Sequence, residues 1–272
     1  MKKILVPIDF SENTRKASEY AARLAKAFDA TLQLLHVYLE PAAIGEVPLV
    51  WMMTESQLQE DYETLVQKEI TYLRQKFRVA VEGQVTTGFK SEEICALAAE
   101  MNADLIIMGN KGSSKSRFMN STTTATLRRT RVPVLVVPEN ADYTPIRQIA
   151  FATDYNEKTN PSSYKLLFEI AQRFNSVIRI VNVKEKPEMM RAHEIAGRMR
   201  LENVMSSLPH EYYTVPDRNV ESGIQTFLRQ HPSDLLVMVA HQHHILEYLL
   251  GTIHTRSMCS QTNLPLLILE DQ

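Results

Sequence analysis

The stretch from Asp104 to Pro138 opens as Asp-Leu-Ile-Ile-Met-Gly-Asn-Lys-Gly, continues through a Ser/Thr-rich segment and closes as Val-Pro-Val-Leu-Val-Val-Pro. Its first apolar run has no polar alternation, which predicts a strand buried on both faces, as in a parallel sheet. Gly109 and Gly112 follow and enclose two polar residues. A glycine turn that presents backbone N–H groups ahead of a helix suits an anion such as phosphate. A tight strand-to-helix turn explains the same residues without a ligand.

The rest of the chain alternates apolar runs with amphipathic segments. The first half has strands expected at 4–8, 31–37, 79–86, 104–108 and 134–137. Helices are expected between them, at 17–28, 58–77, 91–101 and in the segment that closes at Arg129, because apolar residues recur there at spacings of three and four. This order predicts the α/β class, with an open parallel sheet and helices on both of its faces.

The second half of the chain repeats the first. Several residues of the first half recur in the same order, 145 or 146 positions later near the start of each half and 130 to 132 positions later near its end: Ile4 as Ile149, Asp9 as Asp154, Thr14 as Thr159, Val37 as Val183, Asp104 as Asp234, Met108 as Met238, and Leu135 as Leu267. Two copies of one domain explain this pattern. We expect domains at 1–140 and 146–272, joined by a short polar linker that ends at Pro145.

Size and composition exclude several classes of protein. The 272 residues carry a net charge of −2 without a block of basic residues, so nucleic acid is not an expected partner. The N-terminal apolar run is too short for a signal peptide, and no later segment is long and apolar enough for a membrane span. Cys95 and Cys259 are the only cysteines, and both fall in expected helices, which argues against a disulfide. We therefore expect a cytoplasmic protein.

Several motifs in order resemble the universal stress protein family, in its tandem form. They are Lys-Ile-Leu-Val-Pro-Ile-Asp-Phe-Ser-Glu from Lys3, Leu-Leu-His-Val from Leu34, Gly88 before the third helix, and the two motifs of the 104–138 stretch. The resemblance implies five parallel strands per domain in the order 3-2-1-4-5 and pairing of the domains through their last strands. Residues 134–137 would then pair with 266–269 in an intramolecular pseudo-dimer, and two chains would associate further as a homodimer.

The resemblance also implies a ligand, because ligands of such sheets bind where the strand order reverses, between strands 1 and 4. Family members of this type bind ATP, with Mg²⁺, or another adenine nucleotide. The positions that match the family pattern are Pro7, Asp9, Val37, Met108, Gly109, Gly112, Asn120, Ser121 and Thr122. Asn120 stands where the family has a third glycine, and the segment between it and Gly112 is two residues shorter than in the family pattern. Asp9 also has a purely structural interpretation, as a capping box with Glu12.

The second domain departs from the glycine pattern. Val239, Ala240, His241 and Gln242 replace the segment from Gly109 to Gly112, and Thr252 replaces the third glycine. A Cβ at these positions keeps phosphate away from the backbone. We expect this copy to be a structural or regulatory partner that binds no ATP.

Two further stretches have a functional interpretation. His241, His243 and His244 lie together, with His254 and Cys259 downstream, so they are candidates for metal binding or pH sensing, although their spacing matches no zinc signature. The apolar segment 44–53 carries the only tryptophan, Trp51, and suits a lid or a partner-binding surface.

The function expected from these residues is a stress-response regulator whose first domain binds an adenine nucleotide. No catalytic motif is present, so any enzymatic activity would be slow ATP hydrolysis at most. The alternative is a scaffold protein that works without nucleotide, through dimerisation and the Trp51 segment, on an unknown protein partner.

Overall fold

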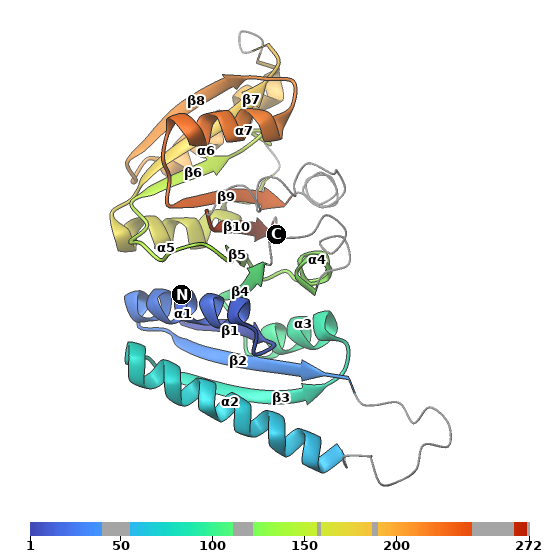
Figure 1. Cartoon of the computed structure of the whole chain (residues 1–272). Helices are drawn as coiled ribbons and strands as arrows, with labels where there is room; N and C mark the ends of the chain where they lie inside the picture. Colours follow the sequence, from blue (N-terminus) through green and yellow to red (C-terminus); the bar gives the residue numbers. More distant parts are fainter. Residues whose placement is uncertain (40–54, 111–121, 157–158, 187–189, 241–263, 271–272) are drawn as a thin grey trace.

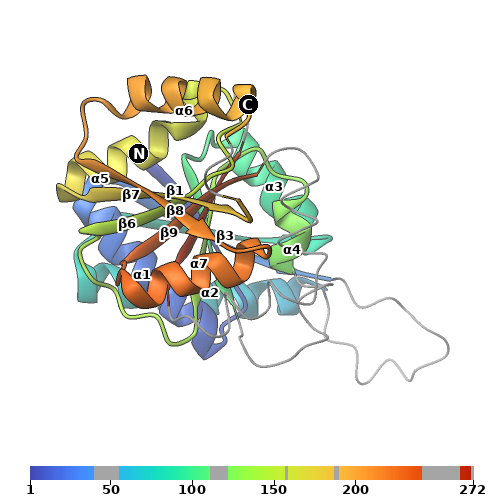
Figure 2. The ribbon, with the colours of Figure 1, turned by 90° about the horizontal axis from the view of Figure 1, so that it is seen from above.

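The computed structural model describes residues 1–39, 55–110, 122–156, 159–186, 190–240 and 264–270. They form one ten-stranded sheet in the order β3-β2-β1-β4-β5-β10-β9-β6-β7-β8, with helices on both faces (Figures 1 and 2). Each half of the chain contributes five strands in the same relative order. The predicted α/β class and the 3-2-1-4-5 order of each half are therefore confirmed, with the two sheets fused into one.

The first half holds the elements that build the predicted site. They are β1 (Lys3–Ile8), α1 (Glu12–Phe28), β2 (Thr31–Tyr38), α2 (Glu55–Phe77), β3 (Val81–Thr87), α3 (Lys90–Glu100), β4 (Leu105–Asn110), α4 (Thr122–Leu127) and β5 (Val134–Pro138). The strands lie close to where the apolar runs place them. β2 and β4 extend further than the sequence predicts, by one and two residues.

The second half repeats this arrangement, with a short 3₁₀ turn at the start of its first helix. Its elements are β6 (Gln148–Ala152), η2 (Pro161–Tyr164), α5 (Lys165–Phe174), β7 (Val177–Lys184), α6 (Ala192–Met205), β8 (His210–Pro216), α7 (Val220–Gln230), β9 (Leu235–Ala240) and β10 (Leu266–Glu270).

The two halves join through their last strands, which run antiparallel in the middle of the sheet (Figure 1). Leu135 of β5 lies opposite Leu267 of β10. On one face, the rings of Phe28 and Phe174 meet edge to face with centroids 5.9 Å apart. The predicted intramolecular pseudo-dimer is thus confirmed, and β5 and β10 leave no free edge at the junction. Association of two whole chains stays a prediction.

The sheet separates two apolar layers. One layer packs α1, α2, α5 and α6 against side chains such as Ile4, and the other packs α3, α4 and α7 against side chains such as Leu5. Both residues are fully buried. Successive residues of a strand point to opposite faces, so the continuous apolar runs of the sequence supply both layers.

A repeated aspartate fixes the start of the first strand in each half. The carboxylate of Asp104 accepts hydrogen bonds from the backbone N–H groups of Lys2 and Lys3, at 2.6 and 3.0 Å. Asp234 accepts them from Arg147 and Gln148, both at 2.8 Å. The match of these two aspartates in the sequence therefore has a structural cause, since each ties the first strand of its half to the neighbouring fourth strand.

The capping box predicted for Asp9 and Glu12 is wrong. The N-cap of α1 is Ser11, whose side chain accepts a hydrogen bond from the backbone N–H of Thr14. Between Asp9 and Ser11, Phe10 adopts a left-handed backbone conformation with φ of 60°. This residue turns the chain before the helix begins, so Asp9 lies outside the helix.

Several predictions fall outside the described residues. These are the Trp51 segment, the histidines from His241 onward and Cys259. Within the described ranges, Cys95 is a half-buried free thiol of α3, and its burial raises the pKa of that thiol. In the same ranges, no three side chains of the metal-binding types gather at one place. None of the described helices combines the length and apolarity that crossing a bilayer requires.

Candidate functional site

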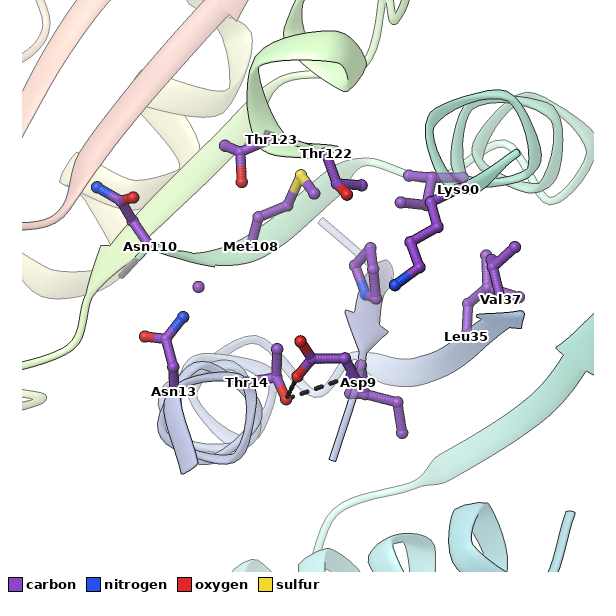
Figure 3. Close-up of a pocket in the computed structure, with 14 residues that line it drawn as sticks. Asp9, Asn13, Thr14, Leu35, Val37, Lys90, Met108, Asn110, Thr122 and Thr123 are labelled. Carbon is purple, nitrogen blue, oxygen red and sulfur yellow. Dashed lines mark hydrogen bonds between the residues drawn. The ribbon is translucent and has the colours of Figure 1, made fainter. Parts of the chain in front are cut away.

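A cavity of about 230 Å³ opens at the carboxyl ends of β1 and β4, where the strand order reverses (Figure 3). This is the position at which parallel sheets bind ligands. The cavity is lined by Pro7, Ile8, Asp9, Asn13, Thr14, Leu35, Val37, Lys90, Ile94, Met108, Gly109, Asn110, Thr122 and Thr123. Three strands (β1, β2 and β4) and three helices (α1, α3 and α4) therefore meet there.

The structure brings together most of the positions that the family pattern selects. Pro7, Asp9, Val37, Met108, Gly109 and Thr122 all line this cavity. Gly112, Asn120 and Ser121 lie outside the described residues. The range 111–121, which holds these three residues, is bounded in the chain by Asn110 and Thr122. Both of these line the cavity.

One side of the cavity is apolar. Leu35 and Val37 of β2, Ile94 of α3 and Met108 of β4 supply it, and all four side chains are at most 4% exposed. They belong to the apolar layer beneath α3 and α4. A flat, largely apolar ring fits such a surface, because burying it removes apolar area from water on both partners.

Asp9 forms a fixed acidic corner of the cavity. Its Oδ1 accepts a hydrogen bond from the backbone N–H of Ser11 at 3.0 Å and another from the Thr14 hydroxyl at 2.9 Å. The second of these bonds is drawn in Figure 3. These two bonds hold the carboxylate in one orientation at the edge of the cavity, where it can accept hydrogen bonds from a ligand.

Lys90 also lines the cavity, although the sequence pattern did not predict it as a site residue. It is the first residue of α3, and its ammonium points into the cavity from the side opposite Asn13 (Figure 3). Among the described residues, no hydrogen bond or ion pair engages that ammonium. Its only signal in the sequence is its place two residues after Gly88, at the start of a helix that begins beside the cavity.

Gly109 has a structural reason to be glycine. A Cβ at this position would lie 2.9 Å from Asn13 Nδ2 and 3.0 Å from the Asn13 backbone oxygen. The start of α1 therefore packs directly on the backbone of β4. Asn13 is itself 6% exposed, and its Oδ1 has no hydrogen-bond partner among the described residues. The glycine that suggested phosphate binding is required here by the contact between a helix and a strand.

In the second half, α7 packs closely on the strand residue that corresponds to Val37. A Cβ on Gly223 of α7 would lie only 2.4 Å from Cγ1 of Val183. The helix thus rests on the residue that repeats Val37, which lines the cavity in the first half. Val239 takes the place of Gly109, as the sequence predicts. Both features set the second half apart from the first at the position of the cavity.

The comparisons with known proteins agree with the fold. The model of the universal stress protein family matches residues 1–138. Universal stress protein A homolog 1 of Coxiella burnetii is 30% identical over 142 residues, which are 50% of this chain and 95% of that protein. A universal stress protein structure from Archaeoglobus fulgidus matches at a TM-score of 0.74 and 16% identity, over 99% of this chain and 96% of that chain. A universal stress protein solved in complex with cAMP covers 51% of this chain and 97% of its own, at a TM-score of 0.40 and 18% identity.

Proposed function

The chain belongs to the universal stress protein family, and from that premise we propose that its first half binds an adenine nucleotide in the cavity between β1 and β4. The observation that carries the proposal is the pairing of an apolar surface with the fixed Asp9 carboxylate at the point where the strand order reverses.

The two sides of the cavity suit the two ends of a nucleoside. The base lies against the apolar side formed by Leu35, Val37 and Met108. The ribose hydroxyl groups donate hydrogen bonds to Asp9, because an ionised carboxylate is an acceptor only. The backbone at Val37 is the position that the family resemblance assigns to reading the adenine edge.

The phosphates would leave the cavity past Asn110, Thr122 and Thr123. In sequence, the range 111–121 between Asn110 and Thr122 carries Lys111, Lys115 and Arg117, which are suited to a polyphosphate. Mg²⁺ is commonly held by substrate phosphates and one or two carboxylates. Asp9 is the one carboxylate among the described cavity residues, so any Mg²⁺ would depend mainly on the phosphates.

The second half has a different role in this proposal. It covers the β5 edge of the first half and binds no nucleotide, because α7 rests on Val183 and Val239 replaces the glycine of β4. The protein is then a binding and regulatory protein with one nucleotide per chain.

Calorimetric titration of the nucleotide-stripped chain with ATP and with AMP, each with and without Mg²⁺, tests the proposal. Asp9→Asn keeps an oxygen that accepts from Ser11 and Thr14 but removes the charge, so it should weaken binding. Asp154→Asn is the matched control, because Asp154 Oδ1 accepts from Asn156 N at 3.1 Å in the corresponding turn of the second half. One site per chain that is weakened only by Asp9→Asn supports the proposal. Absence of binding would favour the nucleotide-independent scaffold.

A further inference from the structure

His36 lies directly behind the nucleotide cavity, on the other face of the sheet. Its neighbours in β2, Leu35 and Val37, line the cavity, and alternation along the strand directs the His36 ring to the face covered by α1 and α2. The ring is 6% exposed. It packs against Phe10 and Tyr62, with centroid distances of 4.6 and 4.4 Å.

A hydrogen bond links His36 to the residue before Asp9. His36 Nδ1 lies 2.9 Å from the backbone oxygen of Ile8. A carbonyl oxygen accepts hydrogen bonds only, so Nδ1 carries the hydrogen and, in the neutral ring, Nε2 carries none. Nε2 is buried and has no hydrogen-bond partner among the described residues.

The His36 ring also packs against Phe10, the residue that follows Asp9. Phe10 has a left-handed backbone conformation, which costs a residue with a Cβ about 1 kcal/mol or more. This conformation turns the Phe10 ring back onto His36. Asp9 is therefore held between a carbonyl that bonds to His36 and a ring that packs on His36.

The second half builds the same turn without an imidazole. Asn182 stands at the position of His36 and donates from Nδ2 to the backbone oxygen of Thr153 at 2.8 Å. Thr153 precedes Asp154, and Tyr155, with φ of 57°, repeats Phe10. The turn thus needs a buried donor to the strand-end carbonyl in both halves, and only the half with the cavity uses imidazole for it.

We infer that His36 is a positioning residue for Asp9, and that proton uptake by its ring loosens the turn and weakens ligand binding in the cavity. The positioning role stands on the contacts above, and the effect on ligand binding rests on the proposed nucleotide function. Protonation leaves the bond from Nδ1 in place. It puts a charged N–H at Nε2 among aromatic rings, where the cost of burying charge favours separation of Phe10 and Tyr62 from the ring.

The charges around His36 allow this response. The titratable groups that face its ring or act on its charge, among the described residues, are Tyr38 of its own strand, Tyr62 of α2, Asp9 of the turn and Lys90 of α3. Burial lowers the pKa of His36 most, and the Lys90 charge lowers it further, whereas the bond to Ile8 and the Asp9 charge raise it. The net direction is downward, so the ring is neutral at pH 7 and takes up its proton only below pH 6.5.

The first experiment needs no ligand. The backbone amide signal of Ser11 is followed by NMR from pH 8 to pH 5 in the full-length chain, because that N–H donates to Asp9 Oδ1. His36→Asn copies the second half, and His36→Leu supplies a side chain of similar size without a donor. We expect the signal to move with the titration of His36 in the wild type, to stay constant in His36→Asn, and to be displaced at every pH in His36→Leu.

The second experiment titrates the same three proteins with ATP at each pH. Below the pKa of His36, the wild type should lose up to about tenfold in affinity per pH unit, while His36→Asn keeps its affinity. The same pH dependence in the wild type and in His36→Asn would overturn the inference, as would a wild-type Ser11 signal in His36→Leu. If ATP does not bind but the Ser11 signals behave as expected, the nucleotide function fails and the positioning role stands.

Discussion

Gly109 and Asn13 touch so closely that a single methyl group between them would collide with the Asn13 side chain and approach its backbone oxygen. The contact fixes the start of α1 against the end of β4. A larger residue at Gly109 would therefore change both the packing of α1 on β4 and the lining of the cavity.

Gly109→Ala is accordingly expected to lower the free energy of unfolding by about 1–3 kcal/mol, the usual cost of overpacking a tight contact. Urea denaturation of the ligand-free chain measures it. Asn13→Ala removes the nearest side-chain atoms, so the double variant should be less destabilised than the sum of the single changes. Equal stability of Gly109→Ala and the wild type would show that the helix can shift at no cost.

Acid should destabilise the protein through His36 before any carboxylate contributes. The folded-state pKa of His36 lies below 6.5, so its stabilising effect is complete above pH 6.5 and is lost as the pH falls toward the folded pKa. The free energy of unfolding can fall by up to about 1.4 kcal/mol for each pH unit in this interval. Glu19 and Glu194, whose pKa values are lowered by their lysine partners against the effect of burial, act only below pH 4.5.

Thermal denaturation of the wild type and His36→Asn across pH 5 to 8 isolates this contribution. The difference in melting temperature between the two proteins should change below pH 6.5 and be constant above it. A difference that is constant over the whole range would mean that His36 keeps its ordinary pKa in the folded protein.

Asp104 and Asp234 should contribute similar amounts of stability, because each carboxylate accepts two backbone hydrogen bonds. Replacement of either by Ala is expected to cost about 1.5–3 kcal/mol, the range for bonds to a charged acceptor. The two sites lie in different halves, so the effects should add in the double variant. Chemical denaturation tests this, and a loss for only one of the two would contradict the equivalence of the repeat.

Lys90→Ala should weaken nucleotide binding by about three- to tenfold, the size expected for a partly solvated charged contact. The weakening should shrink as salt screens the ammonium. Lys26, a basic residue in the last turn of α1, provides the control for the loss of one positive charge. An equal effect of Lys26→Ala would assign the change to net charge, and the Lys90 ammonium would then make no contact with the ligand.

The fold was largely predictable because its signals are local and repeated. Continuous apolar runs identified the strands, and the repeat of Leu135 as Leu267 identified the two strands that pair between the halves. The location of the cavity followed from the strand order once Asp9 and Gly109 were assigned to strand ends.

The details of the site depend on geometry that spacing does not encode. Phe10 inserts a left-handed residue between Asp9 and the helix, which moved the cap to Ser11. Lys90 and Asn13 enter the cavity because two helices begin beside it, and a helix start is among the least certain features of a sequence. Close packing on Asn13 and phosphate binding would each require a glycine at position 109. The sequence therefore could not separate these two causes.

The join between β5 and β10 also has a consequence for regulation in the cell. Because both halves belong to one polypeptide, each meets its partner at an effective concentration set by the short connection between Pro138 and Gln148, independent of expression level. Dilution, competition from other family members and subunit exchange then have no influence on this pairing. A substitution in the crevice of one half then leaves the sheet edge of the other half covered, because the pairing of β5 with β10 does not involve that crevice.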